Sequence, residues 1–172
     1  MKDKLLSKQG WVILLICIIS FFINNRVVVP DIMEARNMVT AREMVHDGNW
    51  LVPTMNGDLR LEKPPLPTWL TAVAEMISPD NLALQRAMAG FAAILLVAFF
   101  YLTAVQVMRN KRYAFISTIL LCTCYNIILM GRTASWDIYC HAFMMGAIYF
   151  LIRAFAAKAC SWKDFTLSLI HI

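Results

Sequence analysis

The residues best suited to chemistry are acids and bases gathered in a polar segment, residues 30–67, of an otherwise apolar chain. Asp31 opens this segment, where it can cap a helix or act as a general base toward a hydroxyl group. Lys63 follows Glu62 and precedes two prolines, which remove backbone donors and fix the direction of the chain. Together with Arg36, Lys63 can present positive charge to a phosphate at a membrane surface. A solvated Glu–Lys surface pair is the alternative.

Asp137 is a further acid, at the edge of an apolar segment. A carboxylate in that position is costly to place, so a functional role and a simple helix terminus both remain open for it. His141 follows one helical turn later. It could bind a metal, but one His beside one Asp is a weak metal signal, and a packed interior histidine is favoured.

The composition is that of an integral membrane protein. Of 172 residues, 60% are hydrophobic and 16% charged, with a mean hydropathy of +0.61. A soluble domain is nearer about half apolar and a quarter charged. The predicted fold class is therefore all-α integral membrane, and the five cysteines, which lie in or beside apolar runs, are expected to be small packing residues. The apolar runs predict four spans, at about residues 11–29, 84–108, 113–131 and 137–157.

The first span could also be the core of a signal peptide, because three lysines precede it. Residues 21–25 offer no small-residue cleavage pattern, so an uncleaved helix that continues through Val29 is favoured. A long loop, residues 30–81, then separates the first span from the second.

The positive charges predict how the chain crosses the membrane. A net charge of +5 could suggest nucleic acid, but Lys and Arg precede the first span, separate the second from the third and follow the fourth. By the positive-inside rule these three regions are cytoplasmic. Loop 30–81 and the connection that contains Arg132 then face outward together, which places Asp31, Lys63 and Asp137 on one side.

The first part of the loop predicts a helix over residues 31–46, from the helical spacing of its apolar residues. Asp31 is its expected N-cap, Glu34 the capping-box partner and Gly48 the stop signal.

Further along the loop, Asn56-Gly57 predicts a tight turn, and Pro67 is expected to start a short helix over residues 67–77. Glu75 is expected to be solvated. Arg86 is expected to snorkel to the outer interface at the start of the second span.

Several motifs occur in a fixed order between residues 31 and 70. They are Asp31-x-x-Glu34-Ala-Arg36, Ala41-Arg-Glu-Met44, Gly48-Asn-Trp50-Leu-Val-Pro53, Asn56-Gly57, Glu62-Lys-Pro-Pro-Leu66 and Trp69-Leu70. This order resembles the N-terminal part of the GT-C membrane glycosyltransferases, in the group of lipid A aminoarabinose transferases and dolichyl-phosphate-mannose protein mannosyltransferases. The resemblance extends over roughly residues 11–157 and implies GT-C-like transmembrane helices with juxtamembrane helices in the first extracytoplasmic loop.

The resemblance implies an enzyme that moves a sugar from a polyprenyl phosphate to a lipid A, protein or glycan acceptor at the outer face of the inner (plasma) membrane. Asp31 resembles the catalytic or acceptor-orienting carboxylate, and Asp137 a second active-site carboxylate. Arg36 and Lys63 resemble residues that bind the donor phosphate. Glu62 resembles a position that can help to hold a divalent metal, which is the one cofactor that the resemblance suggests.

The implied partners are a polyprenyl-phosphate-linked sugar, a lipid or protein acceptor and membrane lipids, without nucleic acid. Members of the family are much longer, so residues 1–172 are expected to be the N-terminal part of a GT-C transmembrane domain. Two alternatives are a non-catalytic membrane fragment and a lipid or solute transport component. The transport reading predicts polar residues paired deep in the spans, whereas most mid-span positions are apolar.

Overall fold

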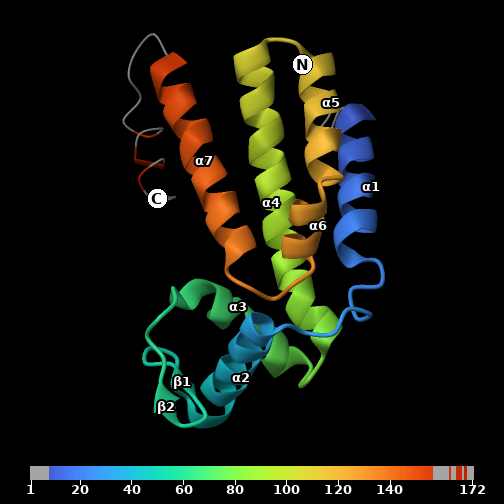
Figure 1. Cartoon of the computed structure of the whole chain (residues 1–172). Coiled ribbons are helices and arrows are strands. Elements are labelled where there is room, and N and C mark those ends of the chain that lie inside the picture. The colour runs from blue at the N-terminus through green and yellow to red at the C-terminus, as the bar shows by residue number, and fades with distance from the viewer. Residues whose placement is uncertain (1–7, 157–162, 164–165, 168, 170–172) are drawn as a thin grey trace.

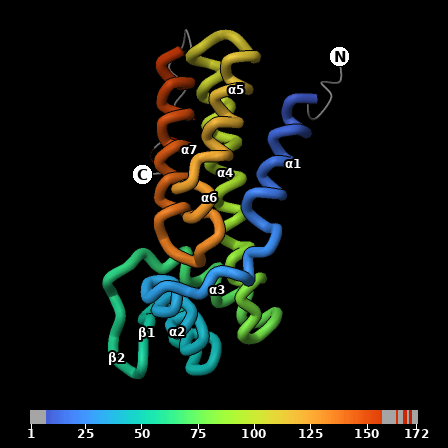
Figure 2. The backbone as a smooth tube through the Cα atoms, turned by 45° about the vertical axis from the view of Figure 1, so that its right-hand side comes forward, coloured from blue at the N-terminus to red at the C-terminus, as the bar shows by residue number. Residues whose placement is uncertain are grey.

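The computed structural model describes residues 8–156, 163, 166–167 and 169, which form a helical bundle with a smaller lobe at one end. Helices α1, α4, α5, α6 and α7 run beside one another in the bundle (Figures 1 and 2). Helices α2 and α3 and a β1–β2 hairpin form the second part, residues 31–81, which we call the polar lobe. The elements are α1 Lys8–Phe22, α2 Ile32–Asp47, β1 Thr54–Met55, β2 Asp58–Leu59, α3 Pro65–Ile77, α4 Leu82–Met108, α5 Lys111–Cys122, α6 Tyr125–Gly131 and α7 Asp137–Ala156.

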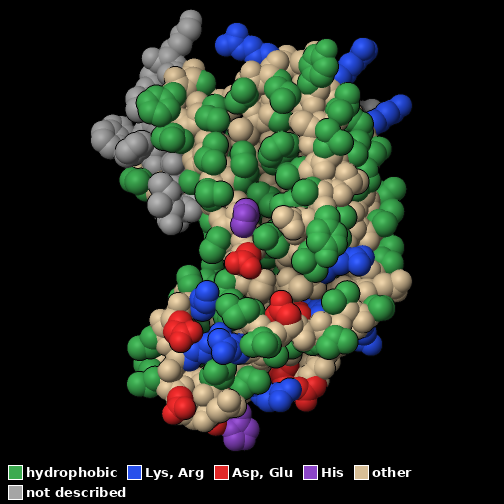
Figure 3. Space-filling model, viewed as in Figure 1, with side chains coloured by type: hydrophobic (Ala, Val, Ile, Leu, Met, Phe, Trp, Pro, Cys, Tyr) green, Lys and Arg blue, Asp and Glu red, His purple; other side chains and the backbone are tan. Residues whose placement is uncertain are grey.

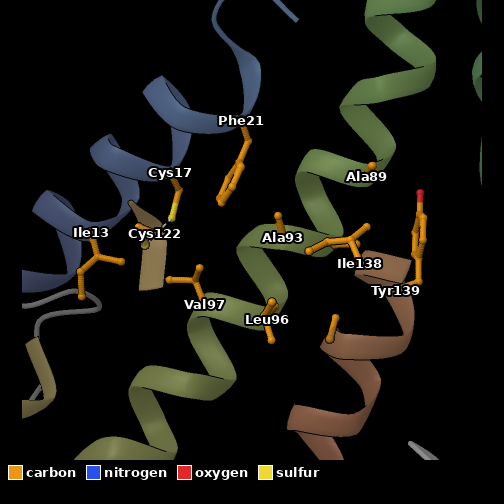
Figure 4. Close-up of a cluster of buried hydrophobic side chains, with 12 residues drawn as sticks. Ile13, Cys17, Phe21, Ala89, Ala93, Leu96, Val97, Cys122, Ile138 and Tyr139 are labelled. Atoms are coloured by element: carbon orange, nitrogen blue, oxygen red, sulfur yellow. Dashed lines mark hydrogen bonds between the residues drawn. The ribbon is translucent and has the colours of Figure 1, made fainter. Parts of the chain in front are cut away.

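Helix α4 is the centre of the bundle and packs against α1, α5, α6 and α7. Small residues let the helices approach closely, as is usual where lipid replaces water as the solvent. Phe21 is fully buried between α1 and α4, close to Ala93 (Figure 4). Cys17 faces Cys122 with 3.8 Å between the two sulfur atoms. That distance is too long for a disulfide, and both side chains are buried as packing residues.

The apolar surface of the bundle identifies a membrane protein. Helices α4 and α7 are long and apolar enough to cross a bilayer. Apolar side chains cover the visible face of the bundle, while most charges lie on the polar lobe and a few at the far end (Figure 3). The fold is therefore all-α apart from the short hairpin, as predicted.

The third predicted span is not one continuous helix. Helices α5 and α6 meet at a bend of 64° and count as one span only if taken together. The hydroxyl of Thr123 hydrogen-bonds to the carbonyls of Ile119 and Leu120, 3.0 and 3.2 Å away. Such a bond competes with the regular helix ladder, and the ladder stops at this point.

The prediction that the first helix continues through Val29 is wrong. Helix α1 ends at Phe22, and Asn24 takes a positive φ of 55°. The guanidinium of Arg132 donates to the carbonyls of Ser20 and Ile23, each 2.6 Å away. A cation at the C-terminus of a helix satisfies carbonyls that have no partner within the helix, which accounts for the stop.

Three local signals of the polar lobe are confirmed: the N-cap of α2, its stop at Gly48 and the hairpin turn. The Oδ1 atom of Asp31 accepts a hydrogen bond of 2.7 Å from the backbone N–H of Glu34 and caps α2. Gly48 ends α2 in the left-handed region, with φ 74°. Asn56 and Gly57, with φ of 56° and 82°, form the turn between β1 and β2.

Two details of the lobe differ from the prediction. Helix α3 begins at Pro65 rather than Pro67, because Pro64 already occupies the N-cap position. Glu75 is buried, not solvated: its carboxylate accepts hydrogen bonds from Gln85 and from the backbone N–H of Asp80.

Candidate functional site

Lys63 lies near Trp136, the residue that precedes Asp137. The Nζ atom of Lys63 lies 5.5 Å from the centre of the Trp136 indole ring. Trp136 is the residue before Asp137, the first residue of α7. The side chains of Lys63 and Asp137 are both exposed. The connection from β2 to α3 and the start of α7 therefore meet at one accessible place, as the topology predicted.

A residue that the sequence analysis did not select, Arg60, is a buried cation beside Trp136. It is 7% exposed, and its guanidinium lies 5.0 Å from the centre of the Trp136 ring. Its Nη1 donates to the carbonyl of Arg36 and to the hydroxyl of Thr40, at 2.6 and 2.7 Å. Arg60 thus ties the β2–α3 connection to α2.

Positive charge is in excess around Arg60. Burial lowers the pKa of Arg60, the charge of Glu62 raises it and the charge of Arg36 lowers it. An arginine nevertheless stays protonated at neutral pH. Within the part of the chain that the structure describes, Arg36, Arg60 and Lys63 form no ion pair. Arg60 is buried and Arg36 and Lys63 are exposed, so the unbalanced positive charge opens to solvent and suits an anionic ligand.

Asp31 lies at the start of α2, exposed, with one oxygen engaged in the helix cap. Among the described residues it makes no ion pair or hydrogen bond with Lys63 or Asp137. The capping role is confirmed, and a catalytic role for Asp31 stays a prediction.

The partner of Glu34 is Arg86, and two predictions about these residues are wrong. Both side chains are fully buried. Two hydrogen bonds of 2.7 Å join the carboxylate to Nε and Nη2 of the guanidinium. Glu34 therefore does not complete a capping box, and Arg86 does not snorkel to the interface. Arg86 also donates to the carbonyl of Asn25, so the pair joins the polar lobe to α4 and to the α1–α2 connection.

The connection between α6 and α7 is held by α2. Oε1 of Glu34 accepts a 2.8 Å hydrogen bond from the backbone N–H of Ala134. Nδ2 of Asn37 donates a 2.7 Å hydrogen bond to the carbonyl of Ala134. Asn37 is fully buried and also bonds to the hydroxyls of Thr68 and Thr71 of α3.

A metal site is not assembled around Glu62. No group of three or more His, Cys, Asp or Glu side chains in the described ranges is placed to hold a metal ion. Glu62 is exposed, and its metal role stays a prediction. Nδ1 of His141 lies 2.6 Å from the backbone oxygen of Asp137, so this ring is held by its own helix.

Comparison with known proteins gives a consistent answer. Residues 10–171 match the sequence profile of the family described as dolichyl-phosphate-mannose-protein mannosyltransferase. An undecaprenyl phosphate-alpha-4-amino-4-deoxy-L-arabinose arabinosyl transferase of Pseudomonas savastanoi pv. phaseolicola is 34% identical over 92 residues, 54% of this chain and 17% of that protein. The protein of the same name from Shewanella sediminis is 31% identical over 108 residues, 63% of this chain and 19% of that protein.

The fold is also found in a solved structure. The crystal structure of ArnT from Cupriavidus metallidurans bound to undecaprenyl phosphate superimposes with a TM-score of 0.79 at 17% identity. It covers 96% of this chain, which corresponds to 31% of that protein. The chain thus spans less than a third of the length of these relatives.

Proposed function

The chain belongs to the dolichyl-phosphate-mannose-protein mannosyltransferase family, and on that premise we propose that it forms part of a lipid-linked-sugar-dependent glycosyltransferase. The donor is a sugar carried on a polyprenyl phosphate, in keeping with the names of its relatives. The observation that carries this proposal is the position of Lys63 and Arg60 over Trp136, directly before Asp137. Cations for a phosphate and a carboxylate for an acceptor then lie at one site.

The cations act on the leaving group. A sugar attached to a polyprenyl phosphate is a phosphodiester, and it becomes a phosphomonoester when its bond to the anomeric carbon breaks. The phosphate therefore gains negative charge along the reaction. Lys63 and Arg36 stabilise that charge, and their effect is greater in the transition state than in the bound donor.

The carboxylates act on the acceptor. A hydroxyl or phosphate oxygen of the acceptor attacks the anomeric carbon from the face opposite the departing phosphate, so the configuration inverts. Asp137 or Asp31 orients this oxygen and takes its proton where it carries one. Both side chains are exposed at the polar lobe and the start of α7, where an acceptor can reach them.

The two ends of the molecule support the proposed placement in the membrane. The α4–α5 turn lies at the end of the bundle opposite the polar lobe (Figure 1). That turn carries Arg109, Lys111 and Arg112. By the positive-inside rule it lies in the cytoplasm, and the polar lobe lies on the outer face of the inner membrane. Exposed apolar side chains of the bundle, such as Trp11, Leu15 and Phe91, face lipid.

A transfer assay on the complete gene product tests the proposal. Membranes that contain the protein are supplied with labelled undecaprenyl phosphate carrying either 4-amino-4-deoxy-L-arabinose or mannose, and label is followed into lipid A and into protein. We expect transfer from one donor, with release of undecaprenyl phosphate. Membranes in which neither donor is consumed, together with no binding of undecaprenyl phosphate to the purified protein, would overturn the proposal.

A further inference from the structure

Two side chains of α2 hydrogen-bond to the backbone of one residue, Ala134. Glu34 and Asn37 are one helical turn apart on the same face of α2. Glu34 accepts a hydrogen bond of 2.8 Å from the N–H of Ala134, and Asn37 donates one of 2.7 Å to its C=O. Because both the N–H and the C=O of Ala134 are hydrogen-bonded, the position and the orientation of this residue are fixed. We call Glu34 and Asn37 the Ala134 clamp.

The clamp lies next to the proposed site along the chain. Trp136 is two residues beyond Ala134, and Lys63 and Arg60 lie over its ring. Asp137 is three residues beyond it, and three residues of fully extended chain span at most about 10 Å. A shift at Ala134 therefore passes directly to the carboxylate of Asp137 and to the aromatic ring under the cations.

A contribution to stability does not by itself explain why a buried ion-pair residue, Glu34, belongs to the clamp. A buried ion pair is often no more stable than well-packed apolar residues of the same volume. Glu34 nevertheless lies fully buried against Arg86, and its Oε1 also accepts a hydrogen bond from the backbone N–H of Ala134. Directional hydrogen bonds supply what apolar packing lacks, which is a single fixed position for the segment before α7.

We propose that Glu34 and Asn37 are positioning residues of the transferase. They fix the positions of Asp137 and Trp136 relative to Lys63. The Asp137 carboxylate, which acts on the acceptor, is then held at a fixed distance from the donor phosphate. This inference rests on the proposed function. It predicts that loss of the clamp impairs the chemical step more than the binding of the donor, because Lys63 and Arg36 stay in the polar lobe when Ala134 is released.

Asn37→Ala tests the clamp, and Thr71→Val is its matched control. Thr71 accepts a hydrogen bond from the same Asn37 amide, at 3.0 Å, but does not bond to Ala134. Both variants weaken the contact between α2 and α3, and Asn37→Ala alone also releases Ala134. We expect Asn37→Ala to lower kcat about 10- to 100-fold, the scale of a 1 Å misplacement. The KM for the lipid-linked donor changes less, and Thr71→Val stays near wild type.

A distance measurement gives a readout besides activity. Spin labels at Leu61→Cys and at native Cys140, with the other cysteines replaced by alanine, report the separation of the β2–α3 connection and α7. Asn37→Ala should broaden this distribution and Thr71→Val should not. If the wild type is active and the two variants agree in both kcat and distribution, the positioning role is overturned. Wild-type protein without transfer from any donor overturns the proposed function itself, and this role with it.

Discussion

Glu34 and Arg86 form an ion pair in which both side chains are fully buried, across 52 residues of sequence. The pair joins α2 of the polar lobe to the first turns of α4. Because Arg86 also donates to the carbonyl of Asn25 and Glu34 accepts from Ala134, four segments meet at this contact. It is therefore one of the points at which the lobe that carries Lys63 is fixed to the membrane bundle.

Arg86→Met should destabilise the protein by about 3–5 kcal/mol, because the charge of Glu34 is then left buried and without its partner. Denaturation of the purified protein in detergent micelles measures the loss. Arg42→Met is the control: Arg42 is 58% exposed and pairs with exposed Asp80 and, at 3.9 Å, with buried Glu75. Glu75 keeps Gln85 and the backbone N–H of Asp80 as donors, so the loss should be smaller than for Arg86→Met.

The double variant Glu34→Met, Arg86→Met extends this test. Removing both charges should recover most of the stability that Arg86→Met loses. Recovery is incomplete, since the N–H of Ala134 then has no acceptor. Losses that simply add in the double variant would contradict a coupled pair.

Lys63→Ala should lower sugar transfer about 10²- to 10³-fold, the cost of removing one group that stabilises developing charge. The measurement is the rate of label transfer from undecaprenyl phosphate-linked sugar in membranes. Lys111→Ala removes a lysine at the opposite end of the bundle and should leave the rate unchanged. Transfer that is undiminished in Lys63→Ala would remove the phosphate role of this residue.

Asp137→Asn should lower kcat by about 10²- to 10⁴-fold if this carboxylate takes the acceptor proton. Binding of undecaprenyl phosphate should persist, because the cations are untouched. Asp58→Asn on the exposed turn of the hairpin is the control for loss of a carboxylate. Equal transfer rates for Asp137→Asn and the wild type would assign the general-base role to Asp31 or to a group beyond the described residues.

Sequence patterns predicted the features that depend on neighbouring residues. Asp31 caps α2, Gly48 ends it and Asn56-Gly57 turns the hairpin, because each acts on backbone within a few positions. The apolar runs likewise predicted the helices of α4 and α7. Charge bias alone predicted that Lys63 and Asp137 lie on one side of the membrane, and the structure places Lys63 near Trp136, the residue before Asp137.

Long-range pairing was outside the reach of these patterns. A charge at position 86, inside an otherwise apolar helix, shows that some partner is needed but not which one. The interface explained Arg86 equally well until the structure placed it beside Glu34. Arg60 gave no signal, because its burial depends on Trp136, which lies far along the chain. The bend after Cys122 was also missed, since neither Pro nor Gly marks it.

Gly131→Ala should destabilise the bundle by about 1–3 kcal/mol, the usual cost of overpacking a core. A Cβ at position 131 would lie 2.6 Å from a ring carbon of Phe21, and that ring is fully buried with no room to move. Alanine is the better helix former by about 1 kcal/mol, so any net loss reflects the steric clash. Thermal unfolding in micelles provides the measurement.

Gly90→Ala is the control for that clash. Its Cβ would meet the ring of Phe22 at 2.9 Å, but Phe22 is only half-buried and can turn away. The variant should therefore lose less stability than Gly131→Ala. Phe21→Leu combined with Gly131→Ala should recover part of the loss, because the shorter side chain vacates the space that the new methyl group needs. If Gly131→Ala is as stable as the wild type, α6 is not packed against α1 through Phe21, and the bend between α5 and α6 must be held by other contacts.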